Sequence, residues 1–123
     1  MQNEVTMEQN PVVDKSFRFA VRIVNLYKYM IREHKEYVLS KQILRCGTSI
    51  GANIAEGQRG QSKADFAAKM NIALKEASET EYWLRLLCET DYLSKEQYRS
   101  LHADIHELIS LLMAICRTAN DTK

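Results

Sequence analysis

The chain has 123 residues, of which 46% are hydrophobic and 27% are charged, and its formal net charge is +1. That length is enough for one domain with its own core, and no apolar run reaches the roughly 18 residues that span a bilayer. The polar, acidic N-terminus shows no pattern of a secretory signal, and the three widely spaced cysteines are typical of small buried residues and not of a disulfide framework. We therefore expect a helical protein of the cytoplasm.

The first predicted helix follows an N-terminal tail, residues 1–13, and begins near Asp14, whose side chain suits the N-cap position. The polar run from Arg32 to Lys35 predicts the turn that ends this helix. Apolar residues recur every three or four positions between these points. They predict the face that packs into the core: Phe17, Ala20, Val24, Tyr27 and Ile31.

The second predicted helix begins between Glu36 and Ser40 and ends at Glu56, where Gly57 suits a left-handed C-terminal cap. All four glycines of the chain lie in or just after this helix, within residues 45–60. This segment lacks the Gly-Lys-Ser/Thr end of a Walker loop and the glycine spacing of a dinucleotide fingerprint. A phosphate-binding loop is therefore excluded, and the segment is predicted to be helical.

Two interior glycines make this second helix unusually thin. Each glycine costs about 0.8–1 kcal/mol relative to alanine in a helix, so Gly47 and Gly51 predict the close approach of another backbone. The helix is small or apolar on two stripes, one of which is Leu44, Thr48, Gly51 and Ala55. We therefore expect it to form part of a subunit interface. The alternative is that both glycines admit a bulky neighbour within the monomer, such as Trp83.

The third and fourth helices have clear start signals. Ser62, with Asp65 three residues later, is a predicted N-cap, and Ser94 with Gln97 forms a capping box. The third helix is predicted to bury Phe66, Met70, Ala73, Ala77, Thr80, Leu84 and Leu87. The fourth is predicted to bury Tyr98, Leu101, Ile105, Leu108, Leu112 and Ile115.

Four such helices with short connections predict an all-α, antiparallel up-and-down four-helix bundle over residues 14–118, followed by a C-terminal tail, residues 119–123. The residues also resemble a known family. The run SIGANIAEG, residues 49–57, together with ALKEASETEYWLRLL, residues 73–87, resembles the signature of the family named for 23S rRNA intervening-sequence proteins. QILR before the first run and SKADF after it, residues 42–45 and 62–66, belong to the same resemblance.

That resemblance implies a bacterial protein that forms a ring-shaped homopentamer of four-helix bundles. It also implies kinship with the accessory variability protein of diversity-generating retroelements, a basic pentamer that binds nucleic acid and a reverse transcriptase. This chain departs from such relatives in charge, because it is nearly neutral. Phosphate neutralisation supplies most non-specific affinity for nucleic acid, and a neutral chain offers less of it.

The resemblance also implies a set of candidate structural or interface residues, to which the packing argument above adds Gly47 and Gly51. The set supplied by the family signature is Arg45, Ser49, Asn53, Glu56, Gly57 and Glu79. We expect the polar ones to form a partly buried network in which Arg45, or an arginine of a neighbouring subunit, pairs with Glu56 or Glu79. An unpaired buried carboxylate would be strongly destabilising. The alternative, an acid/base pair made of Glu56 and Glu79, requires a pocket and a nucleophile that the sequence does not indicate.

The function hypotheses follow from where charge accumulates. Residues 41–75 carry six Lys or Arg against two Asp or Glu, whereas residues 76–123 carry five against nine. One hypothesis is a non-enzymatic oligomer that binds RNA or other nucleic acid through a basic surface made of Lys41, Arg45, Arg59 and Lys63. The other is a protein-interaction scaffold that docks a partner through apolar helix faces and binds no nucleic acid. Neither hypothesis involves a cofactor or a membrane.

Two further groups of residues have a functional and a structural interpretation. His102 and His106 lie one helical turn apart and could bind a metal ion, but they project away from the predicted core, and a solvent-exposed pair is the simpler interpretation. The adjacent aromatic residues Tyr82 and Trp83 could stack on nucleic-acid bases. Aromatic side chains in a helical bundle more often pack in the core or at an interface.

Overall fold

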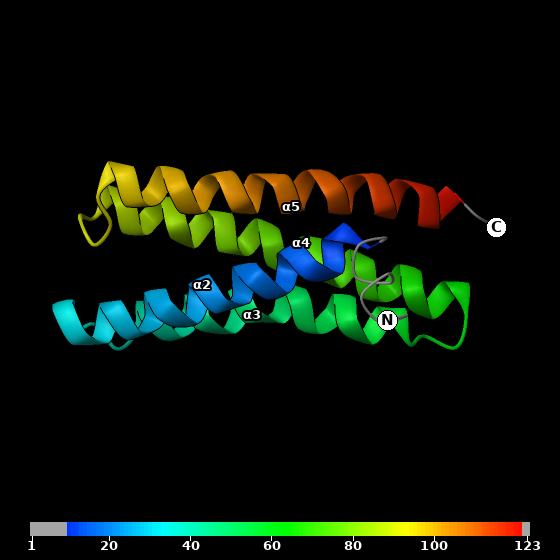
Figure 1. The fold of residues 1–123 in the computed structure, drawn as a ribbon, viewed down its shortest axis with the longest axis horizontal. Coiled ribbons are helices and arrows are strands. Elements are labelled where there is room, and N and C mark those ends of the chain that lie inside the picture. The colour runs from blue at the N-terminus through cyan, green and yellow to red at the C-terminus, as the bar shows by residue number, and fades with distance from the viewer. Residues whose placement is uncertain (1–9, 122–123) are drawn as a thin grey trace.

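The computed structural model describes residues 10–121, which form an up-and-down bundle of four α-helices (Figure 1). These are α2 (Pro11–His34), α3 (Leu39–Gln58), α4 (Lys63–Glu89) and α5 (Lys95–Asp121). Each helix runs back along the one before it, so α2 and α3 form the lower pair and α4 and α5 the upper pair in Figure 1. The predicted all-α, antiparallel architecture is confirmed. Within residues 10–121, no helix is long and apolar enough to cross a membrane.

Helix α2 begins earlier than the sequence indicated. Its first residue is Pro11, whose missing N–H and fixed φ suit the first helical position. Asn10 precedes the helix, and its side-chain amide donates to Gln58 Oε1 at 2.9 Å. The prediction that Asp14 is the N-cap is therefore wrong: Asp14 lies in the first turn and accepts a hydrogen bond from Arg18 Nε at 2.9 Å. Residues 1–9 of the predicted tail lie outside the described residues.

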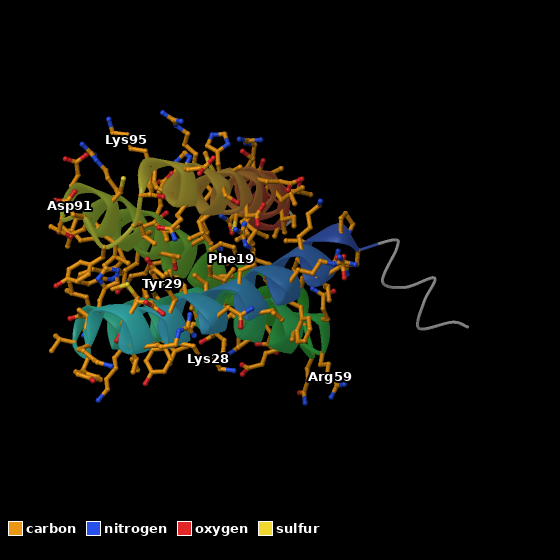
Figure 2. All side chains as sticks on the ribbon, turned by 60° about the vertical axis from the view of Figure 1, so that its left-hand side comes forward. Phe19, Lys28, Tyr29, Arg59, Asp91 and Lys95 are labelled. Carbon is orange, nitrogen blue, oxygen red and sulfur yellow. The ribbon has the colours of Figure 1, made fainter. Side chains whose placement is uncertain are left out.

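The buried face of α2 also differs from the prediction. Phe17 and Val24, which we expected in the core, are exposed. The residues that are buried follow a parallel stripe: Val12, Ser16, Phe19, Ile23, Leu26 and Met30. Phe19 lies near the centre of the bundle (Figure 2). Both stripes have the three-to-four spacing of a helix face, and the longer one, which carries the larger total side-chain volume, is the one that fills the core.

Glu36 determines where α3 begins. Its carboxylate accepts hydrogen bonds from three successive backbone N–H groups, those of Val38 at 3.1 Å, Leu39 at 3.0 Å and Ser40 at 2.8 Å. These donors have no partner within the helix, and a carboxylate at the positive end of the helix dipole is favourable. Ser40 Oγ completes the cap by donating to the backbone oxygen of Glu36 at 2.8 Å.

The end of α3 corrects a second prediction. Gly57 is not a left-handed cap: α3 continues to Gln58, and no glycine of the described chain has a positive φ. The left-handed positions are instead Lys35, with φ of 53°, and Asp91, with φ of 69°. Lys35 ends α2 there, and its backbone N–H donates to Ile31 O at 3.2 Å.

The starts of α4 and α5 are confirmed. Ser62 Oγ accepts a hydrogen bond from the Asp65 backbone at 3.1 Å, and Ser94 and Gln97 exchange two bonds of 2.8 and 3.0 Å as a capping box does. The predicted faces are buried apart from their ends. Phe66, Tyr98 and Ile115 are half-buried, and Cys116 takes the last core position of α5, which extends to Asp121.

The four helices do not contact one another equally. Each packs along most of its length on the next helix in the chain, whereas α2 and α5 meet along a shorter stretch. Polar groups connect that stretch: Lys15 Nζ lies 3.1 Å from Glu107 Oε2, and Arg22 Nη1 lies 2.7 Å from Asp104 Oδ2. Arg22 also donates to Ser100 Oγ at 2.8 Å. The two ion pairs and the hydrogen bond therefore connect α2 with α5 across their shorter contact.

Candidate interaction surfaces

The two interior glycines of α3 bring it close to α2. A Cβ added at Gly47 would lie 2.8 Å from Ile23 Cγ1, and one added at Gly51 would lie 3.3 Å from the backbone oxygen of Ser16. The predicted close approach is thus found within one chain. The neighbour is α2, not Trp83, which packs elsewhere in the core and contacts Glu79. These glycines need no second subunit to explain them.

Gly57 likewise permits close packing, at the face of α3 that contacts α4. A Cβ added there would lie 2.5 Å from Met70 Cε and 3.2 Å from Lys69 Cβ, both on α4. Lys69 Nζ in turn pairs with Glu56 Oε1 at 2.7 Å. The end of α3 is therefore held tightly against the start of α4.

The polar residues of the family signature form two separate groups. Arg45 donates to Glu79 Oε2 at 2.6 Å and to Glu76 Oε1 at 3.4 Å, and Trp83 Nε1 donates to Glu79 Oε2 at 3.1 Å. The pKa of Glu79 is lowered mainly by the hydrogen bond from Trp83. Burial raises the pKa by less than this hydrogen bond lowers it, and the hydrogen bond and charge of Arg45 lower it further. Pairing of Arg45 with Glu79 was one of the two predicted alternatives.

Glu56 belongs to the other group. It pairs with Lys69 rather than with Arg45, and it lies about 16 Å along α3 from the level of Arg45 and Glu79. The hypothesis of a Glu56–Glu79 acid/base pair is therefore wrong. Ser49 and Asn53, between the two groups, donate to backbone oxygens of α3 itself at 2.6 and 2.8 Å. They satisfy their own helix and do not extend the network.

The four basic candidates are spread along α3, the turn that follows it and the start of α4. Lys41 lies in the first turn of α3 and Arg59 just after its last turn, about 27 Å apart along the helix. Arg45 is neutralised by Glu76 and Glu79. Arg59 and Lys63 lie on either side of the turn between α3 and α4, and both are exposed without an ion pair among the described residues. Arg59 points away from the bundle in Figure 2.

The histidine and cysteine candidates are placed for structural roles. His102 Nε2 contacts Glu81 Oε2 at 3.1 Å, and the rings of His102 and His106 are 5.8 Å apart. Among residues 10–121, no group of three or more His, Cys, Asp or Glu is arranged to hold a metal ion. Burial raises the pKa of the Cys46 and Cys116 thiols, which makes them poorer nucleophiles.

An uncharged face extends over the outer side of α2 and α3. On α2 it consists of the exposed side chains of Phe17, Val21 and Val24, with Phe17 66% accessible. On α3 it continues over the predicted stripe of Leu44, Thr48, Gly51 and Ala55. Helix α3 has three charged residues; Arg45 and Glu56 bind α4, and Lys41 lies in the first turn. We call this surface, made of these seven residues, the α2/α3 face.

The sequence indicated only the α3 half of this face. The α2 half was missed because Phe17 and Val24 were assigned to the core. The signal that could have found it is the second stripe itself: when Phe19, Ile23, Leu26 and Met30 fill the core, an apolar stripe at Phe17, Val21 and Val24 is left without a partner in the monomer.

Comparison with known proteins gives one family. The family model described as 23S rRNA-intervening sequence protein matches residues 8–114. Among solved structures, this chain is similar to the crystal structure of a protein of unknown function from the S23 ribosomal protein family of Bacteroides thetaiotaomicron. The two sequences are 62% identical and the TM-score is 0.84. The match covers 85% of this chain and 97% of that chain. No curated protein matches.

Proposed function

Because this chain belongs to the 23S rRNA-intervening sequence protein family, whose model matches residues 8–114, we propose that it is a non-enzymatic module that works as a homo-oligomer assembled through the α2/α3 face. The family resemblance implies a ring of five subunits, and the cytoplasm is the expected compartment. The observation that carries this proposal is the α2/α3 face itself.

Three features support self-association through this face. Phe17, Val21 and Val24 stand on one stripe of α2, one turn apart, and each is exposed in the monomer. Beyond Leu44, the neighbouring stripe of α3 has the small residues Thr48, Gly51 and Ala55, which leave a shallow surface for a partner's larger side chains. Two charged residues of α3, Arg45 and Glu56, are paired with α4, so burial of the α2/α3 face would leave neither of these charges unpaired. Exposed apolar patches of this kind mark protein–protein contacts.

A charge placed at the centre of the face should dissociate the oligomer. In the variant Val21→Lys, an ammonium would have to be buried without a partner, so we expect the monomer to predominate while the helical content stays unchanged. The measurement is mass by light scattering after gel filtration, with circular dichroism to check the fold.

Ile72→Lys is the matched control, because Ile72 is an apolar residue of similar exposure on α4, away from the α2/α3 face. It should leave the mass unchanged. A native protein that is already monomeric at working concentration, or a Val21→Lys variant of native mass, would refute assembly through this face.

RNA binding is a second candidate, supported by the turn between α3 and α4. Arg59 and Lys63 are exposed there, and no acidic residue of the described chain forms an ion pair with either. At this turn one chain offers two cations, and two phosphate contacts give weak affinity. A ring would repeat Arg59 and Lys63 in every subunit. Phosphate contacts made by several subunits at once would raise the affinity for RNA.

Fluorescence anisotropy of a structured rRNA fragment would test this candidate. We expect affinity to fall as salt rises, and to fall further in the double variant Arg59→Ala/Lys63→Ala, because each lost phosphate contact removes counterion release. Lys41→Ala, at the opposite end of α3, should change little. Absence of binding at low salt would leave the protein-interaction scaffold as the function of the oligomer.

A further inference from the structure

A cavity of about 540 Å³ is lined by residues of α4 and α5. In Figure 1 these two helices form the pair opposite α2 and α3, which carry the α2/α3 face. The cavity would stay open if that face were covered by another subunit. Its volume is in the range that holds small-molecule ligands, about 300–1,000 Å³. The side chains that line it are Ser78, Glu81, Tyr82 and Arg85 of α4 with Tyr98 and His102 of α5.

Aromatic rings are concentrated at this cavity. Tyr98 and His102, one turn apart on α5, have ring centroids 5.3 Å apart and planes inclined by 32°, and His106 continues the series at 5.8 Å and 36°. From α4, Tyr82 is 61% exposed, and its ring is supported by the edge of Trp83 at 5.3 Å. A large exposed tyrosine that is held in place on the wall of a cavity offers a flat surface to a planar ligand.

The polar groups of the cavity are of two kinds. Arg85 is a cation for which no ion pair is found among residues 10–121, so its donors are available to an anion. Glu81 is an acceptor: its Oε2 contacts His102, while its Oε1 makes no hydrogen bond within the described chain. Carboxylates accept N–H donors, and guanidinium groups bind phosphate.

We propose that this cavity binds a nucleotide. The base stacks against the exposed ring of Tyr82, with Tyr98 lining the other wall, Arg85 binds the phosphate, and Glu81 accepts hydrogen bonds from the base edge. Guanine presents two adjacent N–H donors to Glu81, N1–H and its amino group, whereas uracil presents a single N–H between two carbonyl oxygens. A guanine nucleotide should therefore bind more tightly than a uracil nucleotide. The nucleotide is either free or an unpaired residue of an RNA strand, since both present the same chemistry. This site is independent of the α2/α3 face and of Arg59 and Lys63.

Calorimetric titration with guanosine 5′-monophosphate tests the proposal. We expect one saturable site per chain, weaker binding of uridine 5′-monophosphate, and a loss of about tenfold or more in Tyr82→Ala and in Arg85→Gln. Tyr82→Phe should keep the affinity because it keeps the ring. Tyr37→Ala and Arg117→Gln are matched controls, since both replace an exposed side chain of the same type outside the cavity.

A short guanine-containing single-stranded RNA, titrated in parallel, distinguishes the two sources of nucleotide. If it binds with the same dependence on Tyr82 and Arg85 while the mononucleotide does not, the site holds an unpaired RNA residue. If neither ligand binds saturably, or if binding is unaffected in both Tyr82→Ala and Arg85→Gln, the proposal is wrong. Circular dichroism of each variant confirms that the bundle is intact.

Discussion

Replacing Gly47 with leucine is expected to detach α2 from α3 and to unfold the chain at moderate urea concentration. Even a single Cβ at this position would meet Ile23 Cγ1 at 2.8 Å and Cγ2 at 2.9 Å. Ile23 is fully buried and β-branched, so it cannot rotate away. Overpacking of this kind lowers the free energy of unfolding by about 1–3 kcal/mol, and a leucine side chain should lower it further than a single methyl group does. We therefore expect Gly47→Ala to be destabilising although alanine gains about 0.8–1 kcal/mol of helix propensity.

Variants at neighbouring positions make this prediction specific. At Gly51 the nearest atom is Ser16 O at 3.3 Å, so Gly51→Ala should be close to neutral while Gly51→Leu should separate the helices. Ala52→Leu, at an exposed position of α3, should retain stability. In a double-mutant cycle, the variant Gly47→Ala/Ile23→Ala should lose less free energy of unfolding than the two single variants lose together. The reason is that Ile23→Ala makes room for the Cβ that Gly47→Ala introduces. Additive costs would show that Ile23 is not the obstacle.

Replacing Glu36 with alanine is expected to remove about 2 kcal/mol from the free energy of unfolding, since three N–H groups at the start of α3 lose a charged acceptor. Chemical denaturation would measure the loss. Glu89→Ala is the control: Glu89 is an exposed carboxylate at the end of α4, and its removal should have little effect.

The contribution of Glu36 should also depend on pH. Burial raises the pKa of this carboxyl, but the backbone hydrogen bonds from Leu39, Ser40 and Val38 outweigh it and hold the pKa below the ordinary 4.5. A group whose pKa is lowered on folding stabilises the fold above its unfolded-state pKa and loses that effect as pH falls through the folded-state value. The stability gap between the native chain and Glu36→Gln should therefore be constant near neutral pH and shrink below about pH 4.5. A gap that stays constant down to pH 3 would contradict the cap.

The sequence was sufficient to predict features that depend only on residues near one another in the chain. Ser62 and the pair Ser94 and Gln97 were predicted because an N-cap depends on residues three apart in one segment. Gly57 was misassigned as a cap because a glycine after a helical run suits either a left-handed turn or a close contact, and only Met70, from the next helix, decides between them. Lys35 ends α2 in the left-handed conformation, which is unfavourable for lysine, and nothing in the sequence marks it as a C-terminal cap.

Contacts between helices were predictable only in part. Arg45 with Glu79 could be proposed because antiparallel neighbours bring the two signature runs together. The face of α2 could not be chosen, since two stripes of equal periodicity compete and the outcome depends on which one α3 and α5 cover together. The cavity at Tyr82 and Arg85 depends on the register of α4 against α5, which the periodicity of either helix leaves undetermined.

The order in which the helices contact one another has a consequence for how the chain acquires its fold. Most contacts join each helix to its immediate successor, and the contact that joins the first helix to the last is short and includes two ion pairs. The mean sequence separation of contacting residues is therefore low for a bundle of this size, and topologies of that kind fold quickly. Helices α2 and α3 can dock as a hairpin while the rest of the chain is still being synthesised, with Gly47 already against Ile23. The thin helix is thus expected to be an early nucleus as well as a packing element of the finished bundle.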